Sequence, residues 1–258
     1  DALVGNPAFG NSARFDGSGD YLQVPDSDDW GFGTEDFTID FRMKFDANIN
    51  TGFVGQSADG ASTGNNQWYF SHNSADHMAY FYWKDGGVTN AYYGINWSPS
   101  ADTWYHLALV RNGSNLYFFV NGVAQNVISI IPIGTRSLGN IAAPLRVGSA
   151  PDTSAPSMSG GLDEFRISKG IARWTSNFTP STQEYTQDEY TKLLLHFNAY
   201  RYETTRTAYT TDAQGNTTTT TTDSLGLLRQ ETKDSQGRVI YHRERNGKIE
   251  TNSGFEGE

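Results

Sequence analysis

Acidic side chains in one glycine-rich loop have the spacing of a cation-binding turn. Asp16 and Asp20 belong to the segment Phe15-Asp-Gly-Ser-Gly-Asp20, whose side chains and carbonyl groups can both offer oxygen ligands. Ca²⁺ takes about six to eight oxygen ligands in proteins. We therefore expect these two carboxylates to bind calcium, with a simple turn as the alternative.

A third carboxylate stands in an apolar stretch. Asp163 lies between Leu162 and Phe165, where burial of an unpaired carboxylate is unfavourable. A metal ion would offset that cost, and so would a buried guanidinium from Arg14 or Arg166. The sequence alone leaves both possibilities open.

Aromatic and amide side chains alternate in two segments, 65–68 and 92–97. Sugars bind to exposed aromatic faces flanked by side chains that hydrogen-bond hydroxyl groups. We therefore expect a glycan site without catalysis. Its candidate residues are Asn66, Trp68, Trp83, Tyr93, Asn96 and Trp97. The alternative is that these aromatics cover a sheet or form a subunit contact.

Glycoside hydrolysis needs two carboxyl groups at a fixed separation, about 5–5.5 Å in retaining enzymes and about 6.5–9.5 Å in inverting ones. A strand presents such a pair at positions i and i+2, and this sequence has no Glu-x-Asp-x-Glu triplet. Asp36 and Asp40 come nearest, but at i, i+4 on a strand they lie ~13 Å apart. Asp163 and Glu164 point to opposite faces. We expect no enzymatic activity, and glycoside hydrolysis remains the less favoured alternative.

The composition excludes several function classes. Acidic residues outnumber basic ones 29 to 19 and the basic ones form no stripe, so nucleic acid is not an expected partner. No apolar run approaches the ~20 residues of a membrane span. The chain has no cysteine, which excludes disulfides and thiolate chemistry. It begins with Asp1 instead of Met, which we interpret as a removed leader or a piece of a longer chain.

The elements that must position these residues have a hydrophobic period of two. From Phe37 to Phe45, apolar residues alternate with polar ones, which is typical of a strand with one buried face. Similar short runs recur about every 10–20 residues to Phe197, and Asn-Gly and Asp-Gly pairs between them favour tight hairpins. Helix is expected at most for a turn or two, around 169–174. The pattern predicts an all-β, antiparallel jelly-roll sandwich over residues 1–198.

Three segments, taken together and in order, resemble the laminin G-like branch of the concanavalin A-like lectin and glucanase family. They are Ser12–Pro25 followed by Phe37–Phe41, then Trp104–Gly122, and then Gly160–Ser168 with its tail Gly170–Pro180. The resemblance covers residues 1–198. It is closest to copies in phage and viral structural proteins.

The resemblance implies a lectin-like function and a structural Ca²⁺ where Asp163 meets Asp16. It favours a carbohydrate-binding or adhesion module on an extracellular or virion surface, as part of a fibre or decoration protein. The alternative is a purely structural assembly subunit that makes only protein contacts.

Residues 199–258 have a different composition. Asp212-Ala-Gln-Gly215, Asp223-Ser-Leu-Gly226 and Asp234-Ser-Gln-Gly237 repeat every 11 residues, and Asn246-Gly247 follows one residue late. Asp-x-x-Gly fits a type I turn, so the region is predicted to be a β-meander of threonine-rich strands. It loosely resembles YD repeats. Because its apolar content is low, we expect it to order through its own subunits or a larger assembly.

Overall fold

The fold is seen in a computed structural model of the chain. The structure describes residues 3–6, 10–58, 64–150, 157–197, 206–222 and 228–244. Its contacts divide the chain into two compact units, Asp1–Ala199 and Tyr200–Glu258.

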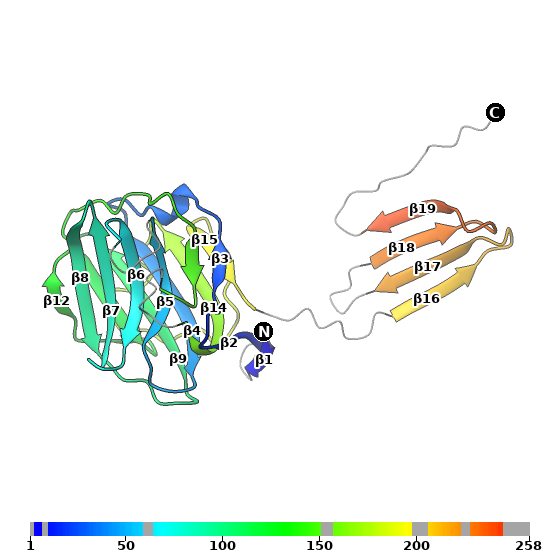
Figure 1. The fold of residues 1–258 in the computed structure, drawn as a ribbon. Helices are drawn as coiled ribbons and strands as arrows, with labels where there is room; N and C mark the ends of the chain where they lie inside the picture. The colour runs from blue at the N-terminus through cyan, green and yellow to red at the C-terminus, as the bar shows by residue number, and fades with distance from the viewer. Residues whose placement is uncertain are drawn as a thin grey trace. The chain divides into compact units, whose positions relative to one another are not determined.

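The first unit is a sandwich of two antiparallel sheets (Figure 1). Within the described residues its first sheet holds eight strands. In spatial order these are β1 (Leu3–Asn6), β2 (Gly10–Asp16), β14 (Ser159–Lys169), β4 (Phe37–Phe45), β9 (Trp104–Asn112), β10 (Asn115–Val120) and β11 (Val123–Ala124), and β15 (Thr191–Leu195) pairs with the second half of β14.

The second sheet holds seven strands in the described part of the chain. Their order is β12 (Ile128–Ile131), β8 (Val88–Asn96), β7 (Met78–Asp85), β6 (Gln67–Asn73), β5 (Thr51–Ser57), β13 (Leu145–Val147) and β3 (Leu22–Val24). Strands β5 to β8 are antiparallel neighbours in chain order. The predicted Asp85-Gly86 turn joins β7 to β8, and Gly86 has a φ of 55°.

Aromatic side chains fill the space between the two sheets. Phe41 of β4 packs against Phe53 of β5 and Phe70 of β6, with ring centroids 5.4 and 5.9 Å apart, and against Phe165 of β14 at 5.6 Å. All four rings are buried. The alternation of apolar residues along β4 therefore places one face of this strand in the core.

Strand β9 is buried on both faces. Leu107 and Leu109 belong to the main core, while Ala108 and Val110 lie on the opposite face in a second cluster. That cluster is covered by Trp174 and Phe178 together with other residues of the segment 171–190. We call 171–190 the covering segment, because it crosses the outward face of the first sheet.

The predicted all-β antiparallel jelly-roll fold is confirmed. The helical turn is in another place than expected: a 3-10 turn, η1, spans Asp28–Trp30, where Ser27 accepts a hydrogen bond from the Asp29 amide. Residues 171–174 are irregular backbone. None of the helices in the described residues is long and apolar enough to span a bilayer.

The second unit contains a four-stranded antiparallel sheet of β16 (Arg206–Thr211), β17 (Thr217–Thr222), β18 (Leu228–Lys233) and β19 (Val239–Glu244). The predicted turns at Asp212 and Asp234 join β16 to β17 and β18 to β19. The predicted turns at Asp223 and Asn246 lie outside the described residues.

Candidate functional site

Four tyrosine rings form one cluster on the outward face of the second sheet. Tyr69, Tyr82 and Tyr92 lie directly opposite one another on β6, β7 and β8, and Tyr80 lies two residues from Tyr82. Ring centroids are 5.2 Å apart for Tyr69 and Tyr82, 5.8 Å for Tyr82 and Tyr92, and 6.0 Å for Tyr80 and Tyr92. We call these four residues the tyrosine face.

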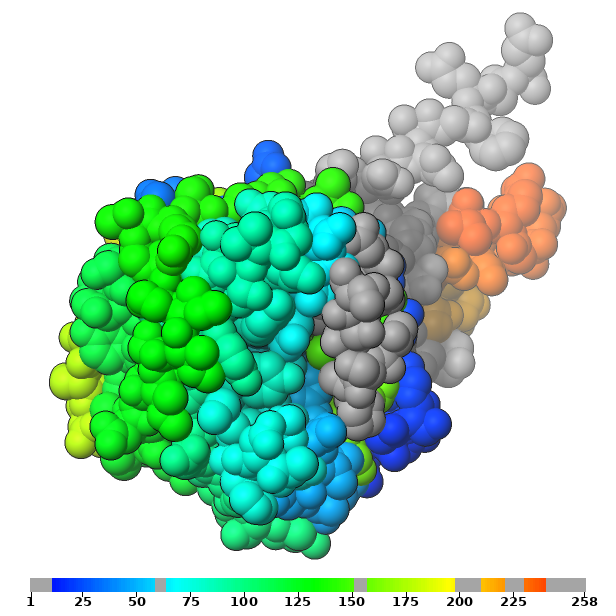
Figure 2. Space-filling model, turned by 60° about the vertical axis from the view of Figure 1, so that its left-hand side comes forward, coloured from blue at the N-terminus to red at the C-terminus, as the bar shows by residue number. Residues whose placement is uncertain are grey.

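Register shows that the tyrosine face points away from the core. Trp68 and Phe70, the neighbours of Tyr69 along β6, both belong to the core, and successive side chains on a strand point to opposite faces. Tyr80, Tyr82 and Tyr92 are half-buried, so part of each ring is open to solvent. Figure 2 shows the cyan and green atoms of this part of the chain on the surface turned toward the viewer.

Polar and apolar groups border these rings. The Tyr82 hydroxyl lies 2.9 Å from Thr89 Oγ1. Burial, the nearby charge of Asp76 and the neighbouring Tyr82 raise the pKa of the Tyr92 phenol above 10.0, so its hydroxyl keeps its proton at neutral pH. On β12, Ile131 lies opposite Tyr92 and adds an aliphatic side chain beside the row of rings.

A pocket of about 320 Å³ opens at the end of β7. We call it the end pocket. Its lining consists of Ala58, Asn66, Trp83, Lys84, Asp85, Gly139, Asn140, Ile141 and Ala142. Lys84 follows Tyr82 by two residues and so lies on the same face of β7 as the tyrosine face. The Asn66 side chain accepts a hydrogen bond from the Gly86 amide, 2.8 Å, and is held at the rim.

Three of the aromatic residues predicted to bind sugar are part of the core. Trp68, Trp83 and Tyr93 have 0%, 2% and 4% of their surface exposed. Trp68 Nε1 donates to Gln56, and the Tyr93 hydroxyl accepts from the Ile133 amide. The prediction selected residues of β6, β7 and β8 whose side chains point into the core. The partly exposed tyrosine rings belong to the alternate residues of these strands, whose side chains point outward. Of the three, Trp83 still forms a wall of the end pocket.

The other three predicted sugar ligands lie apart. Asn66 is at the end pocket, where β6 begins, whereas Asn96 and Trp97 are at the other end of the sheet, where β8 finishes. Asn96 is exposed, and Trp97 is half-buried with its ring 5.6 Å from Phe45. The structure therefore does not gather Asn66, Asn96 and Trp97 into one site.

The predicted calcium ligands are not brought together either. In the pairing of β2 with β14, Asp16 lies opposite Ser159, and Asp163 is four residues, ~13 Å, further along the strand. Asp16 accepts a hydrogen bond from the Ser18 amide and Asp20 accepts one from the Asp16 amide, as in a closed turn. Among the described residues no three acidic or histidine side chains are placed to hold a metal ion.

Asp163 is fully buried and accepts a hydrogen bond of 2.9 Å from the Glu164 amide. Each of the two arginines considered as a partner of Asp163 forms an ion pair with another carboxylate. Arg14 pairs with Asp46, and Arg166 pairs with Asp40. The residues present do not fit the calcium site that the resemblance implied.

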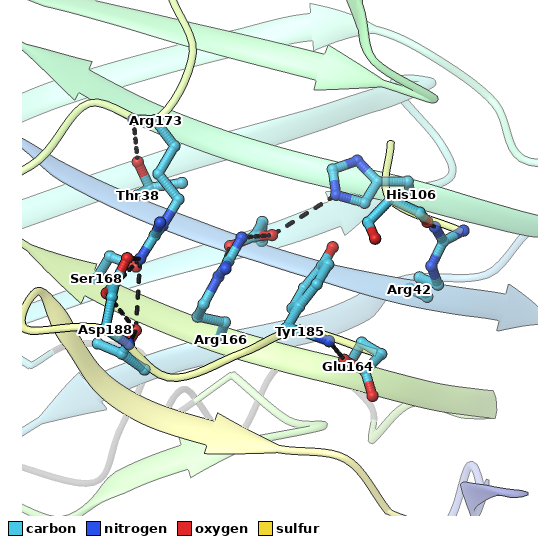
Figure 3. Close-up of polar contacts among 12 residues, drawn as sticks. Thr38, Arg42, His106, Glu164, Arg166, Ser168, Arg173, Tyr185 and Asp188 are labelled. Carbon is cyan, nitrogen blue, oxygen red and sulfur yellow. Dashed lines mark hydrogen bonds and ion pairs between the residues drawn. The ribbon is translucent and has the colours of Figure 1, made fainter. Parts of the chain in front are cut away.

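A buried polar network that the sequence did not reveal lies on the first sheet (Figure 3). Arg166 Nε and Nη2 donate to the two oxygens of Asp40 at 3.0 and 2.9 Å, and His106 Nε2 lies 3.6 Å from Asp40. The Tyr185 ring lies over the Arg166 guanidinium at 4.0 Å. Asp40 and Arg42 alternate with Ile39 and Phe41, so period two already placed them on the outward face.

Electrostatics keep the Asp40 carboxylate of this network ionised. Burial acts to raise the pKa of the Asp40 carboxyl, but the neighbouring His106 and the Arg166 guanidinium outweigh it and hold the pKa below 3.8. Burial raises the pKa of the Tyr185 phenol well above its ordinary value. Glu164, also fully buried, accepts from the Tyr185 amide at 2.6 Å and pairs with His196 at 2.7 Å. These contacts hold the covering segment against the first sheet.

A second pocket, of about 340 Å³, lies over this network. Its lining consists of Arg166, Ile171, Arg173, Trp174, Ser181, Glu184, Tyr185 and Thr186. Arg166 and Arg173 are each paired with a carboxylate, those of Asp40 and Asp188. Their charges are therefore already neutralised, which makes this pocket a weaker candidate than the tyrosine face.

The family model of the concanavalin A-like lectin/glucanases superfamily matches residues 16–173. A comparison with curated protein sequences found no match. Domain 4 of AbnA, a GH43 extracellular arabinanase from Geobacillus stearothermophilus, solved with arabinotriose, is similar at TM-score 0.47 and 16% identity, over 66% of this chain and 76% of that one.

Two further solved structures are similar over part of the chain. Mouse laminin alpha1 domains LG4-5 align at TM-score 0.43 and 16% identity, over 65% of this chain and 46% of that one. Tailspike protein 2 of bacteriophage CBA120 aligns at TM-score 0.49 and 12% identity, over 66% of this chain and 27% of that one. On the family match, which covers more than half of its length, this chain belongs to the concanavalin A-like lectin/glucanase superfamily, in the laminin G-like branch.

Proposed function

We propose that this protein is a non-catalytic carbohydrate-binding module that holds a glycan chain across the tyrosine face. The observation that carries the proposal is the row Tyr69, Tyr82 and Tyr92 on three adjacent strands. Strands lie about 4.8 Å apart, so this row spans roughly 10 Å. A surface of that length matches an extended chain of sugars better than a single ring.

The chemistry of the face suits sugars. Phenol rings offer apolar surface for the C–H side of a pyranose and a hydroxyl that can donate and accept. The end pocket adds amide and charged side chains from Asn66, Lys84, Asp85 and Asn140, which can hydrogen-bond the hydroxyl groups of a sugar at one end of the chain.

Two observations favour binding without hydrolysis. Strands β5, β6 and β8 contain no Asp or Glu, and β7 contains only Asp85 at its end, whereas hydrolysis requires a carboxyl pair. The carboxylates of Asp40, Asp163 and Glu164 are fully buried in the other sheet and take part in hydrogen bonds or ion pairs.

We further propose that the protein acts as an adhesion module on an extracellular or virion surface, because extended polysaccharides are displayed on cell surfaces. The remaining alternative is a structural subunit whose sandwich makes only protein contacts. These two functions differ in whether any glycan binds.

The test is a glycan array followed by calorimetry on the best ligand. We expect Tyr82→Ala to weaken binding at least ~10-fold, equivalent to about 1.4 kcal/mol, because it removes the central ring of the row. Tyr82→Phe keeps the ring and should retain most of the affinity. Tyr117→Ala is the matched control, since Tyr117 is a half-buried tyrosine of β10 in the other sheet.

The proposal fails if the folded protein binds no glycan on the array, which would favour the structural alternative. It also fails if Tyr82→Ala and Tyr117→Ala weaken binding equally, because the tyrosine face would then have no special role.

A further inference from the structure

An arginine lies in the same cross-strand row as the tyrosine rings. Arg146 of β13 lies opposite Gly55 of β5, and Gly55 lies opposite Tyr69 of β6. The neighbours of Arg146 along β13, Leu145 and Val147, belong to the core, so the Arg146 side chain points outward, on the side of the tyrosine face. Gly55 places no side chain between Arg146 and Tyr69. Because strands lie about 4.8 Å apart, the backbones of Arg146 and Tyr69 are about 10 Å apart across the sheet.

The guanidinium of Arg146 is held in place but its charge is not neutralised. It lies over the Tyr21 ring, 4.6 Å from the ring centroid, and such stacking leaves the N–H groups at the edge of the guanidinium free to donate. Arg14, Arg166 and Arg173 are each paired with an aspartate. Within the described residues, Arg146 has no such carboxylate partner. Its side chain is half-buried, so part of it is open to a ligand.

Acidic residues are scarce in the sheet that carries this row. Its seven described strands contain one carboxylate, that of Asp85 at the last position of β7, beside the two cations Lys84 and Arg146. The described strands of the first sheet contain four carboxylates, those of Asp16, Asp40, Asp163 and Glu164. The whole chain has a formal charge of −10. An anion would therefore meet less repulsion at the second sheet than at the first.

One further carboxylate acts on the row, at the end away from Arg146. Besides burial, the charge of Asp76 raises the pKa of the Tyr92 phenol. Asp76 follows β6 and precedes β7, whereas Tyr92 lies on β8, four strands from Arg146 in the order of the sheet. The row thus has a cation at one end and a carboxylate near the other.

We propose that the glycan held across the tyrosine face is acidic, and that Arg146 pairs with a carboxylate of the sugar bound beside Tyr69. This inference rests on the proposed function and names its class of ligand, a chain that contains uronic acid. A guanidinium meets a carboxylate through two parallel N–H···O hydrogen bonds, which the single hydroxyl of a neutral sugar does not match. Arg146 determines the specificity in this arrangement, while the tyrosine rings supply the contact area.

Titration calorimetry on matched oligosaccharides tests the class of sugar. The probes are oligomers of hexuronic acids and the same oligomers after reduction of their carboxylates to primary alcohols. We expect the protein to bind the best uronate oligomer at least ~10-fold more tightly than its reduced form, equivalent to about 1.4 kcal/mol. Arg146→Gln should bind both forms equally, and its affinity for the reduced form should stay within ~3-fold of wild type, which shows that the variant is folded. Arg146→Lys should keep part of the preference, because it retains the charge without the planar fork.

Lys192→Gln is the matched control and should keep the full preference, because Lys192 is an exposed cation of β15 in the other sheet. Equal binding of the two forms by wild type overturns this inference but leaves the proposed function standing, provided that Tyr82→Ala weakens both. An unchanged preference in Arg146→Gln also overturns the inference. If no probe and no glycan on the array binds, the proposed function and this inference fail together.

Discussion

At the scale of single residues, the first sheet contains a buried ion pair between Asp40 and Arg166. Asp40 has none of its surface exposed and meets Arg166 through two hydrogen bonds, with His106 on its other side. Removing one partner of a buried pair leaves the other charge uncompensated, which is strongly destabilising. The network therefore makes the position of the covering segment sensitive to a single carboxylate.

Asp40→Asn should lower the free energy of unfolding by about 3–5 kcal/mol at neutral pH. Because the pKa of Asp40 in the folded protein lies below 3.8, its ionised form stabilises the fold above about pH 3.8. This stabilisation is lost as pH falls through the folded-state pKa. The difference between wild type and variant should shrink in that acid range.

Urea unfolding at several pH values measures this difference. The control is Asp102→Asn, because Asp102 is 79% exposed in its ion pair with Lys44, and exposed pairs contribute about 0–1 kcal/mol. A difference for Asp40→Asn that is equally large at pH 7 and in strong acid would refute the assigned role of the ionised carboxylate.

At the scale of elements, two Asn-Gly turns of similar sequence have different surroundings. Gly113 joins β9 to β10 with φ 58°, and Gly122 joins β10 to β11 with φ 76°. A Cβ at Gly113 would meet nothing within 4 Å, whereas one at Gly122 would lie 2.0 Å from the Phe178 carbonyl oxygen. The Phe178 amide also donates to the Gly122 carbonyl at 2.9 Å. The covering segment therefore packs directly against the second turn.

Gly113→Ala should destabilise the protein only by the left-handed backbone strain, about 1–2 kcal/mol. Gly122→Ala should add about 1–3 kcal/mol for the steric clash, because the backbone of the covering segment must move away from the turn. Differential scanning calorimetry compares the two, and limited proteolysis should cut near residue 178 only in Gly122→Ala. Equal stability of the two variants would contradict the packing described for the covering segment.

At the scale of the whole molecule, the two units depend on different kinds of stabilisation. All residues described in the two hydrophobic clusters lie between Ala13 and Phe197, in the first unit. The second unit has regular turns and paired strands, but its described side chains are half-buried or exposed. The first unit should therefore fold alone.

A chain ended at Ala199 should keep the main melting transition of the full protein within about 2 °C, since the core is unchanged. It should bind a short glycan with unaltered affinity. Differential scanning calorimetry measures the melting transition, and titration calorimetry with the short glycan measures the affinity. A clearly lower transition for the shortened chain would contradict the separate core of the first unit.

The sequence by itself determined the elements. Period-two alternation predicted the strand at Phe37–Phe45, and the Asp-x-x-Gly spacing predicted the turns at Asp212 and Asp234. The family followed from three ordered segments. All of these are properties of residues close together in the chain, where backbone sterics and local hydrogen bonds decide the outcome.

Only the tertiary structure decided which face of each strand is open. Trp68 and Tyr69 are adjacent aromatic residues, and alternation says only that they point in opposite directions. Which one meets the core depends on β4, β9 and β14, which come from distant parts of the chain and lie behind β6. The partners of Asp163 and Arg166, and the difference between Gly113 and Gly122, were hidden for the same reason: burial and contact are set by long-range packing, which a local pattern does not encode.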